Sequence, residues 1–121
     1  MNNEPWPTEI RLKDKGRTFV VSFDPGESFD LSAEYLRVMS PSAEVQGHSP
    51  AERQTVPGKI NVEITNVDPI GNYAVRLIFD DMHSTGIYSW VYLHELGVKH
   101  AEYWQVYLDE LAAKKLSRDR A

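Results

Sequence analysis

Residues 60–79 read Ile-Asn-Val-Glu-Ile-Thr-Asn-Val-Asp-Pro-Ile-Gly-Asn-Tyr-Ala-Val-Arg-Leu-Ile-Phe. Apolar residues alternate with polar ones from Ile60 to Ile64 and again over residues 73–79, which is the two-residue period of a strand with one buried face. Residues 68–72 lie between these segments and are rich in residues that favour turns. The stretch therefore predicts two antiparallel strands joined by a turn at residues 68–72.

A similar hairpin is predicted near the start of the chain. Residues 8–12 and 17–23 alternate polar and apolar side chains on either side of Asp14-Lys15-Gly16, and Asp24-Pro25-Gly26 ends the second strand. A short helix follows over residues 32–38, and Asp30 or Ser32 is placed to accept hydrogen bonds from its first amides.

Pro41 prevents this helix from continuing. Residues 42–57 then contain Gly47, two prolines and no apolar periodicity. This composition predicts a long loop of the kind that often carries function.

The C-terminal third predicts helices. Residues 84–88 favour a short strand, and Ser89 is expected to cap a helix that ends near Leu96, with Gly97 as its left-handed stop. A last helix over residues 101–115 has an aromatic-rich face that is typical of core packing. The residues of that face are Trp104, Leu108, Leu111 and Lys115, with Tyr103 and Tyr107 alongside.

These elements predict one α+β domain over residues 1–121, in which antiparallel hairpins pack against two or three helices. Its core is expected over about residues 6–111. The basic tail, residues 114–121, is expected to complement the carbonyl end of the last helix and then to fray into solvent.

Composition excludes several functions. The chain has 121 residues, a net charge of -5 and no cysteine. Cysteine-ligated zinc, iron-sulfur clusters bound by thiolates and thiol nucleophiles are therefore excluded within this chain. The negative charge disfavours nucleic acid as a partner. We expect no membrane association and a cytoplasmic location, because the chain shows neither a signal-peptide pattern nor a membrane-spanning apolar run.

The familiar catalytic motifs are absent from the sequence: it has no glycine-rich phosphate loop, no Gly-x-Ser-x-Gly elbow and no His-Glu-x-x-His helix. Among the histidines, His83 follows Asp80 and Asp81, so an imidazole and carboxylates have the chemistry to converge on a cation. His48 follows Glu44 on the long loop and is a second possible metal ligand. The competing interpretation is that both histidines make ordinary hydrogen bonds instead of binding a metal. If the loop that carries His48 lies close to the loop that carries Asp80, Asp81 and His83, the two loops would form a polar cleft.

Three segments resemble one domain family, the gamma-butyrobetaine-hydroxylase-like N-terminal domains, and in particular its stand-alone bacterial members. They are residues 36–48, residues 87–90 and residues 92–97, which read Leu-Arg-Val-Met-Ser-Pro-Ser-Ala-Glu-Val-Gln-Gly-His, Ile-Tyr-Ser-Trp and Tyr-Leu-His-Glu-Leu-Gly. The resemblance extends over about residues 6–111. In the hydroxylase itself the similar domain holds a structural zinc with three cysteines and one histidine.

The resemblance makes His83 the counterpart of the zinc histidine, while Ser40, Ser42 and the region of Val45 stand where the cysteines are expected. Neutral hydroxyls and a valine do not replace three thiolates, so we do not expect this chain to bind the structural zinc of the hydroxylase domain. The oxygenase domain is also absent, and the hydroxylase activity is not carried over either. Related domains fused to P-loop iron-sulfur carriers suggest an adaptor in metal-cluster or metabolic pathways.

We therefore expect a non-catalytic accessory domain that binds a partner protein or a small ligand. The expected face is formed by residues 40–48 and 80–90, and Arg37 is available for an anion. Its candidate residues are Arg37, Ser40, Ser42, Glu44, His48, Tyr88 and Trp90. An alternative is a metal-dependent enzyme, with a divalent ion such as iron or zinc bound by His83, Asp80 or Asp81, and His48. A third possibility is a building block of a homo-oligomer, which predicts a large apolar patch away from both loops.

Overall fold

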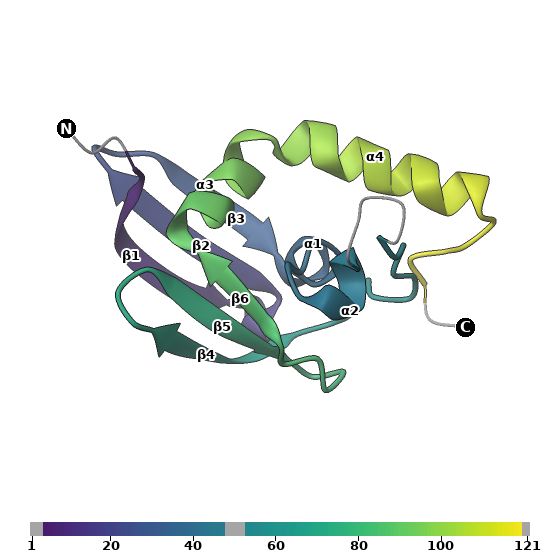
Figure 1. The fold of residues 1–121 in the computed structure, drawn as a ribbon, viewed down its shortest axis with the longest axis horizontal. Helices are drawn as coiled ribbons and strands as arrows, with labels where there is room; N and C mark the ends of the chain where they lie inside the picture. Colours follow the sequence, from purple (N-terminus) through teal and green to yellow (C-terminus); the bar gives the residue numbers. More distant parts are fainter. Residues whose placement is uncertain (1–3, 48–52, 120–121) are drawn as a thin grey trace.

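The structure, a computed structural model, describes residues 4–47 and 53–119 (Figure 1). It consists of two three-stranded sheets, one 3-10 turn and four helices. In chain order the elements are β1 (Trp6–Lys13), η1 (Asp14–Gly16), β2 (Thr18–Asp24), β3 (Ser28–Ser32), α1 (Ala33–Val38), α2 (Ala43–Gln46), β4 (Ile64–Ile70), β5 (Ala74–Phe79), β6 (Gly86–Ser89), α3 (Trp90–Val98) and α4 (His100–Ala113). The predicted α+β class is confirmed.

Both sheets are antiparallel, with strand orders β1-β2-β3 and β4-β5-β6. The predicted first hairpin forms around η1, where Gly16 has φ +87° and an added Cβ would lie 2.2 Å from the carbonyl oxygen of Ile64. Only glycine permits this approach of the first hairpin to the start of β4. Strand β3, which pairs with β2, was not predicted, since residues 24–26 were expected to end the first hairpin.

The second hairpin is shifted along the chain from its predicted position. Strand β4 begins at Ile64, and Asp68 and Pro69, which were predicted to form the turn, pair instead with Arg76 and Val75. Proline is tolerated there because β4 is an edge strand, on which a missing N–H need not break the ladder. The prediction of a strand over residues 60–64 and a turn over residues 68–72 is therefore wrong.

The main hydrophobic core lies between the two sheets and the helices α1 and α3. Its fully buried side chains include Phe19, Phe23, Leu31, Tyr35, Leu36, Leu77, Phe79, Tyr88, Leu93 and Leu96. A second, smaller cluster of Val38, Tyr107 and Leu111 fixes α4 against the end of α1. Helices α1 and α3 thus pack with both sheets in one core, and α1 also packs against α4, so it is covered from several sides.

The predicted caps of α1 and α3 are confirmed. Ser32 Oγ accepts from the Tyr35 amide at 3.0 Å, and Ser89 Oγ accepts from the Tyr92 amide at 3.0 Å. Among the helices that the structure describes, none is long and apolar enough to span a bilayer.

Residues 114–119 of the C-terminal tail do not fray as predicted. Arg118 donates two hydrogen bonds to the carboxylate of Glu34, at 2.8 and 2.7 Å, and its guanidinium lies 5.1 Å from the centre of the Trp104 ring. Glu34 is buried within α1, so this ion pair neutralises a charge that would otherwise be desolvated without a partner. Arg118 thereby holds this part of the tail against α1 and α4.

Gly97 is not the left-handed stop of α3, because it lies inside that helix. An added Cβ would lie 2.5 Å from the ring of Phe29 on β3, so glycine is required for the close packing of helix against strand.

Gly97→Ala is therefore expected to lower the free energy of unfolding by about 1.5 kcal/mol, because steric overlap with Phe29 outweighs the higher helix propensity of alanine. Urea denaturation measures the change. Gly26→Ala is the matched control: a Cβ there has no neighbour within 4 Å, and its effect is expected to stay within about 0.5 kcal/mol. Equal midpoints for the Gly97 variant and the wild type would contradict the packing role.

Candidate functional site

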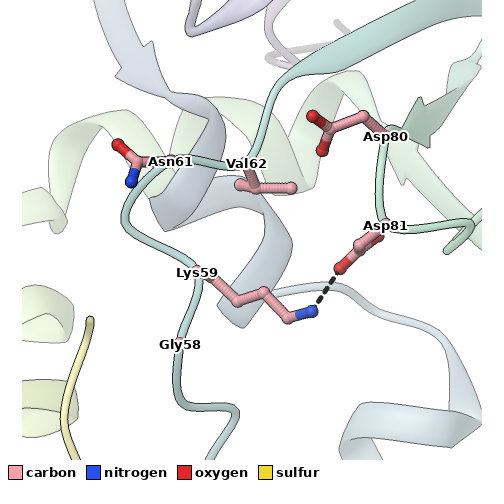
Figure 2. A pocket seen from close by; sticks show the side chains of 6 residues that line it. All are labelled: Gly58, Lys59, Asn61, Val62, Asp80 and Asp81. Atoms are coloured by element: carbon pink, nitrogen blue, oxygen red, sulfur yellow. Dashed lines mark ion pairs between the residues drawn. The ribbon is translucent and has the colours of Figure 1, made fainter. Parts of the chain in front are cut away.

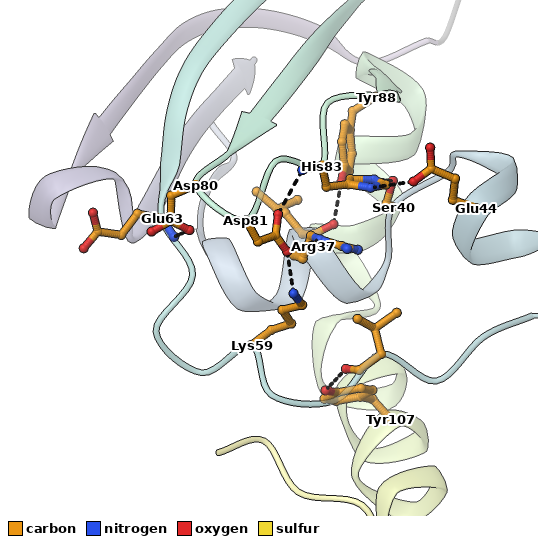
Figure 3. Close-up of polar contacts among 12 residues, drawn as sticks. Arg37, Ser40, Glu44, Lys59, Glu63, Asp80, Asp81, His83, Tyr88 and Tyr107 are labelled. Atoms are coloured by element: carbon orange, nitrogen blue, oxygen red, sulfur yellow. Dashed lines mark hydrogen bonds and ion pairs between the residues drawn. The ribbon is translucent and has the colours of Figure 1, made fainter. Parts of the chain in front are cut away.

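The end of α1, the segment that follows it and the connection between β5 and β6 meet in a cluster of polar side chains (Figure 3). Asp81 is at its centre. One carboxylate oxygen accepts from Arg37 Nε at 2.8 Å and from Lys59 Nζ at 2.6 Å, and the other accepts from the His83 amide at 3.1 Å. The carboxylate thus binds two cations and one backbone donor.

This environment lowers the pKa of Asp81. Partial burial alone would raise the pKa, but hydrogen bonds from Lys59, the His83 amide and Arg37 outweigh it and lower the pKa from 3.8 to about 2. The carboxylate therefore stays charged far below neutral pH.

The side chain of His83 turns away from Asp81. Its Nε2 lies 2.9 Å from Ser40 Oγ, and its Nδ1 lies 3.3 Å from a carboxylate oxygen of Glu44. Because a carboxylate can only accept, the hydrogen belongs on Nδ1, and Nε2 accepts from the serine hydroxyl. Burial, together with the charge of Arg37, lowers the pKa of His83 below 6.5 and favours this neutral form.

The order Ser40, His83, Glu44 has the connectivity of a hydrolase triad, but its surroundings do not suit hydrolysis. Ser40 has no exposed surface and His83 is 5% exposed. A nucleophile must reach a substrate carbonyl, and this hydroxyl is enclosed by protein. Ser40 Oγ instead accepts from the Ser42 amide at 3.3 Å and stabilises the chain where α1 ends.

Two tyrosines, the buried Tyr88 and the partly buried Tyr92, complete the cluster by donating to carbonyls at the end of α1. The Tyr88 hydroxyl donates to the Leu36 carbonyl, and the Tyr92 hydroxyl donates to the Met39 carbonyl at 2.6 Å. Burial raises the pKa of both phenols, so they remain protonated donors. Their role is to satisfy the last carbonyls of a helix that is enclosed in the core.

The structure corrects the expected recognition face. Ser40, Ser42 and Tyr88 are buried and Arg37 has only 12% of its side chain exposed, so these four side chains present little surface at the expected face. Glu44 is exposed as expected. Trp90 begins α3 and donates from Nε1 to the Asn72 carbonyl at 3.0 Å, next to the β4–β5 turn. His48 lies outside the described residues.

Of the predicted metal ligands, the three that the structure describes, Asp80, Asp81 and His83, are turned toward different partners. The carboxylate of Asp81 is bound to two cations, and Asp80 is turned toward β4, where it accepts from the Glu63 amide at 3.1 Å. Across residues 4–47 and 53–119, no group of three or more histidine and acidic side chains is arranged to hold a metal ion.

The structure brings Ser40 to His83, the expected counterpart of the zinc histidine, and the Ser42 amide donates to Ser40 Oγ. Two hydroxyls and one imidazole do not match a set of three thiolates and one imidazole, so these residues do not fit a structural zinc. Ser42 Oγ and Arg37 Nη1 are buried without a hydrogen-bond partner among the described residues.

Sequence reasoning missed Lys59, and it did not single out Met82 within residues 80–90 of the expected face. Lys59 lies in the long segment before β4 and lines a pocket of about 240 Å³ beside Asp80 and Asp81 (Figure 2). Its pairing with Asp81 joins segments far apart in the chain, and no local pattern signals it. Met82 is 88% exposed, and the one available signal was an apolar residue between charged and imidazole side chains.

We expect the Asp81 network to make stability depend on pH. The pKa of Asp81 is lower in the folded protein than its ordinary value of 3.8, so its stabilisation is complete above pH 4 and is lost as the pH falls toward 2. Asp81→Asn is expected to lower the free energy of unfolding at pH 7 by about 2 kcal/mol and to flatten the loss between pH 4 and 2.

Urea denaturation at pH 7, 5, 4, 3 and 2 tests this expectation. The control is Asp109→Asn, which removes an exposed carboxylate on α4 and is expected to leave the acid profile of the wild type. If Asp81→Asn loses as much stability between pH 4 and 2 as the wild type, the network is not the source of the acid sensitivity.

Comparison with known proteins shows which family and which solved structures this chain resembles. The family model described as gamma-butyrobetaine hydroxylase-like, N-terminal, matches residues 10–94. Two proteins with NMR solution structures are similar over nearly the whole chain: one is 42% identical with a TM-score of 0.85, covering 98% of this chain and 94% of its own, and the other is 47% identical with a TM-score of 0.83, covering 99% and 89%.

A crystal structure from Acidithiobacillus ferrooxidans ATCC 23270, of a protein with unknown function in the DUF971 family, is 40% identical with a TM-score of 0.63 and covers 75% of this chain and 91% of its own. No curated protein matches the chain. The resemblance noted in the sequence is therefore confirmed by a family match over more than half of the chain and by three solved structures. The chain belongs to the gamma-butyrobetaine hydroxylase-like N-terminal domain family, also called DUF971.

Proposed function

We propose that this protein is a non-catalytic module that docks a partner protein through the β5–β6 turn, residues 80–85, with Met82 at its tip. The observation that carries the proposal is the conformation of Met82. Its side chain is 88% exposed, and its φ of +77° lies in the left-handed region that residues with a Cβ adopt at a cost of about 1 kcal/mol. Strain of this kind persists where surrounding contacts hold it in place.

The two neighbours of Met82 supply those contacts. Asp81 is bound to Arg37 and Lys59, and the ring of His83 lies between Ser40 and Glu44 (Figure 3). Within the turn, the Met82 amide donates to the Phe79 carbonyl at 3.2 Å. Anchors on both sides present the methionine from a rigid base, so little conformational entropy remains to be lost when a partner binds.

The chemistry around the tip indicates the kind of partner surface. Methionine is adaptable and polarisable, and it is common at binding surfaces that accept apolar contacts. Asp80 is exposed beside it, and the side chain of Glu44 is 64% exposed at the other anchor. An apolar pocket rimmed by basic side chains would complement this turn.

Enzymatic function receives less support: within the part of the chain that the structure describes, the arrangement with catalytic connectivity is Ser40 with His83 and Glu44, and its serine and histidine are buried. The expected link to metal-cluster or metabolic pathways and the cytoplasmic location stay predictions that rest on the sequence.

Met82→Gly tests the proposal without endangering the fold. Glycine adopts a positive φ freely, so the free energy of unfolding is expected to stay within about 1 kcal/mol of the wild type. The partner is first identified by cross-linking in cells of the source organism, and both proteins are then purified. Calorimetric titration is expected to show at least about tenfold weaker binding for Met82→Gly, because the buried methionine contact is lost.

The matched control is Val98→Ala, which shortens another exposed apolar side chain, at the end of α3. It is expected to bind the purified partner like the wild type. Equal affinities for Met82→Gly and the wild type would overturn the role of the turn.

A further inference from the structure

A second surface, independent of the Met82 turn, has the features of a binding site. A hollow of about 280 Å³ lies where the start of β1, the β4–β5 turn and the start of α3 meet. Trp6, Tyr73 and Trp90 line it from these three segments, together with Glu4, Asn72 and Val91. We refer to it as the aromatic hollow.

The aromatic hollow exposes more apolar surface than a packing role requires. Trp6 is 59% exposed, Tyr73 57% and Val91 48%. Large aromatic side chains stabilise a fold by being buried, and open aromatic surface around a concavity is typical of recognition sites.

The walls of the hollow are held in place before any ligand arrives. Trp90 Nε1 donates to the Asn72 carbonyl at 3.0 Å, and the Trp90 amide donates to the Tyr73 carbonyl at 3.1 Å. These two bonds join the β4–β5 turn to the first residue of α3. The Trp90 indole is therefore oriented by the backbone of the turn that carries Tyr73.

An acidic residue lines the aromatic hollow. Among the described residues that line it, Glu4 is the charged one. Asp24 pairs with Trp6 across the first hairpin, and cross-strand partners of an antiparallel pair project to the same face of the sheet. Aromatic faces attract cations through their quadrupole, and nearby carboxylates add to that attraction.

We propose that the aromatic hollow binds an arginine side chain presented by a peptide segment of another protein. A planar guanidinium stacks on indole and phenol rings and at the same time donates to a carboxylate. Its aliphatic stem suits the apolar contacts of Val91 and the rings. The site thereby combines stacking, charge and an apolar wall in one concavity.

The probe for this site is N-acetyl-arginine amide, and its neutral counterpart of nearly equal shape is N-acetyl-citrulline amide. Both are titrated into ¹⁵N-labelled protein while amide and indole cross-peaks are followed. We expect the arginine probe to shift the indole signals of Trp6 and Trp90 and to bind about tenfold more tightly than the citrulline probe. The indole of Trp104, which lies under Arg118, serves as an internal control and is expected to stay unshifted.

Two variants test whether the arginine probe binds in the aromatic hollow. Trp6→Ala is expected to abolish the shifts, and Glu4→Gln to weaken binding of the arginine probe several-fold while leaving the citrulline probe unchanged. If Trp6→Ala perturbs β1, Tyr73→Ala removes an exposed ring at the turn and is expected to give the same loss. Met82→Gly is expected to bind the probe like the wild type, which separates this site from the proposed docking turn.

Three outcomes would overturn the inference. The first is equal binding of the two probes, which would make the hollow a site for uncharged apolar segments. The second is an absence of shifts in the hollow at millimolar arginine probe. The third is binding that persists in both Trp6→Ala and Tyr73→Ala.

Discussion

The burial of α1 is the constraint on which the rest of this structure depends. A six-residue helix enclosed on several sides cannot hydrate its last carbonyls, and each unpaired carbonyl would cost free energy comparable to a lost hydrogen bond. The donors come from other elements: Tyr88 on β6 reaches the Leu36 carbonyl and Tyr92 on α3 reaches the Met39 carbonyl. The helix therefore fits only if the second sheet and α3 are already in place.

Local signals in the sequence were sufficient where local chemistry decides the structure. The turn at Asp14–Gly16 and the caps Ser32 and Ser89 were predictable because each acts within a few residues. The register of β4 was not, since its proline is tolerated only on an edge strand, and edge position is a property of the whole sheet. Gly97 was misinterpreted for the same reason, because its close neighbour Phe29 is distant in sequence.

The candidate site was likewise predictable in part from the sequence. The two loops singled out in the sequence do meet, and Ser40 and Glu44 reach His83 as a polar cleft would require. Whether such a cluster is a surface site or a buried one depends on the packing around it, which periodicity does not reveal. Here Ser40 and His83 are buried, whereas Glu44 and Met82, the residue between Asp81 and His83, are exposed.

The ion pair between Glu34 and Arg118 bears on how the chain is made. Glu34 lies buried in α1, and the guanidinium that compensates it is synthesised 84 residues later. A nascent chain that enclosed α1 early would hold an unpaired carboxylate in a low-dielectric interior, at a cost of several kcal/mol. The enclosed form of α1 is therefore complete only when the segment after α4 is in place to supply Arg118.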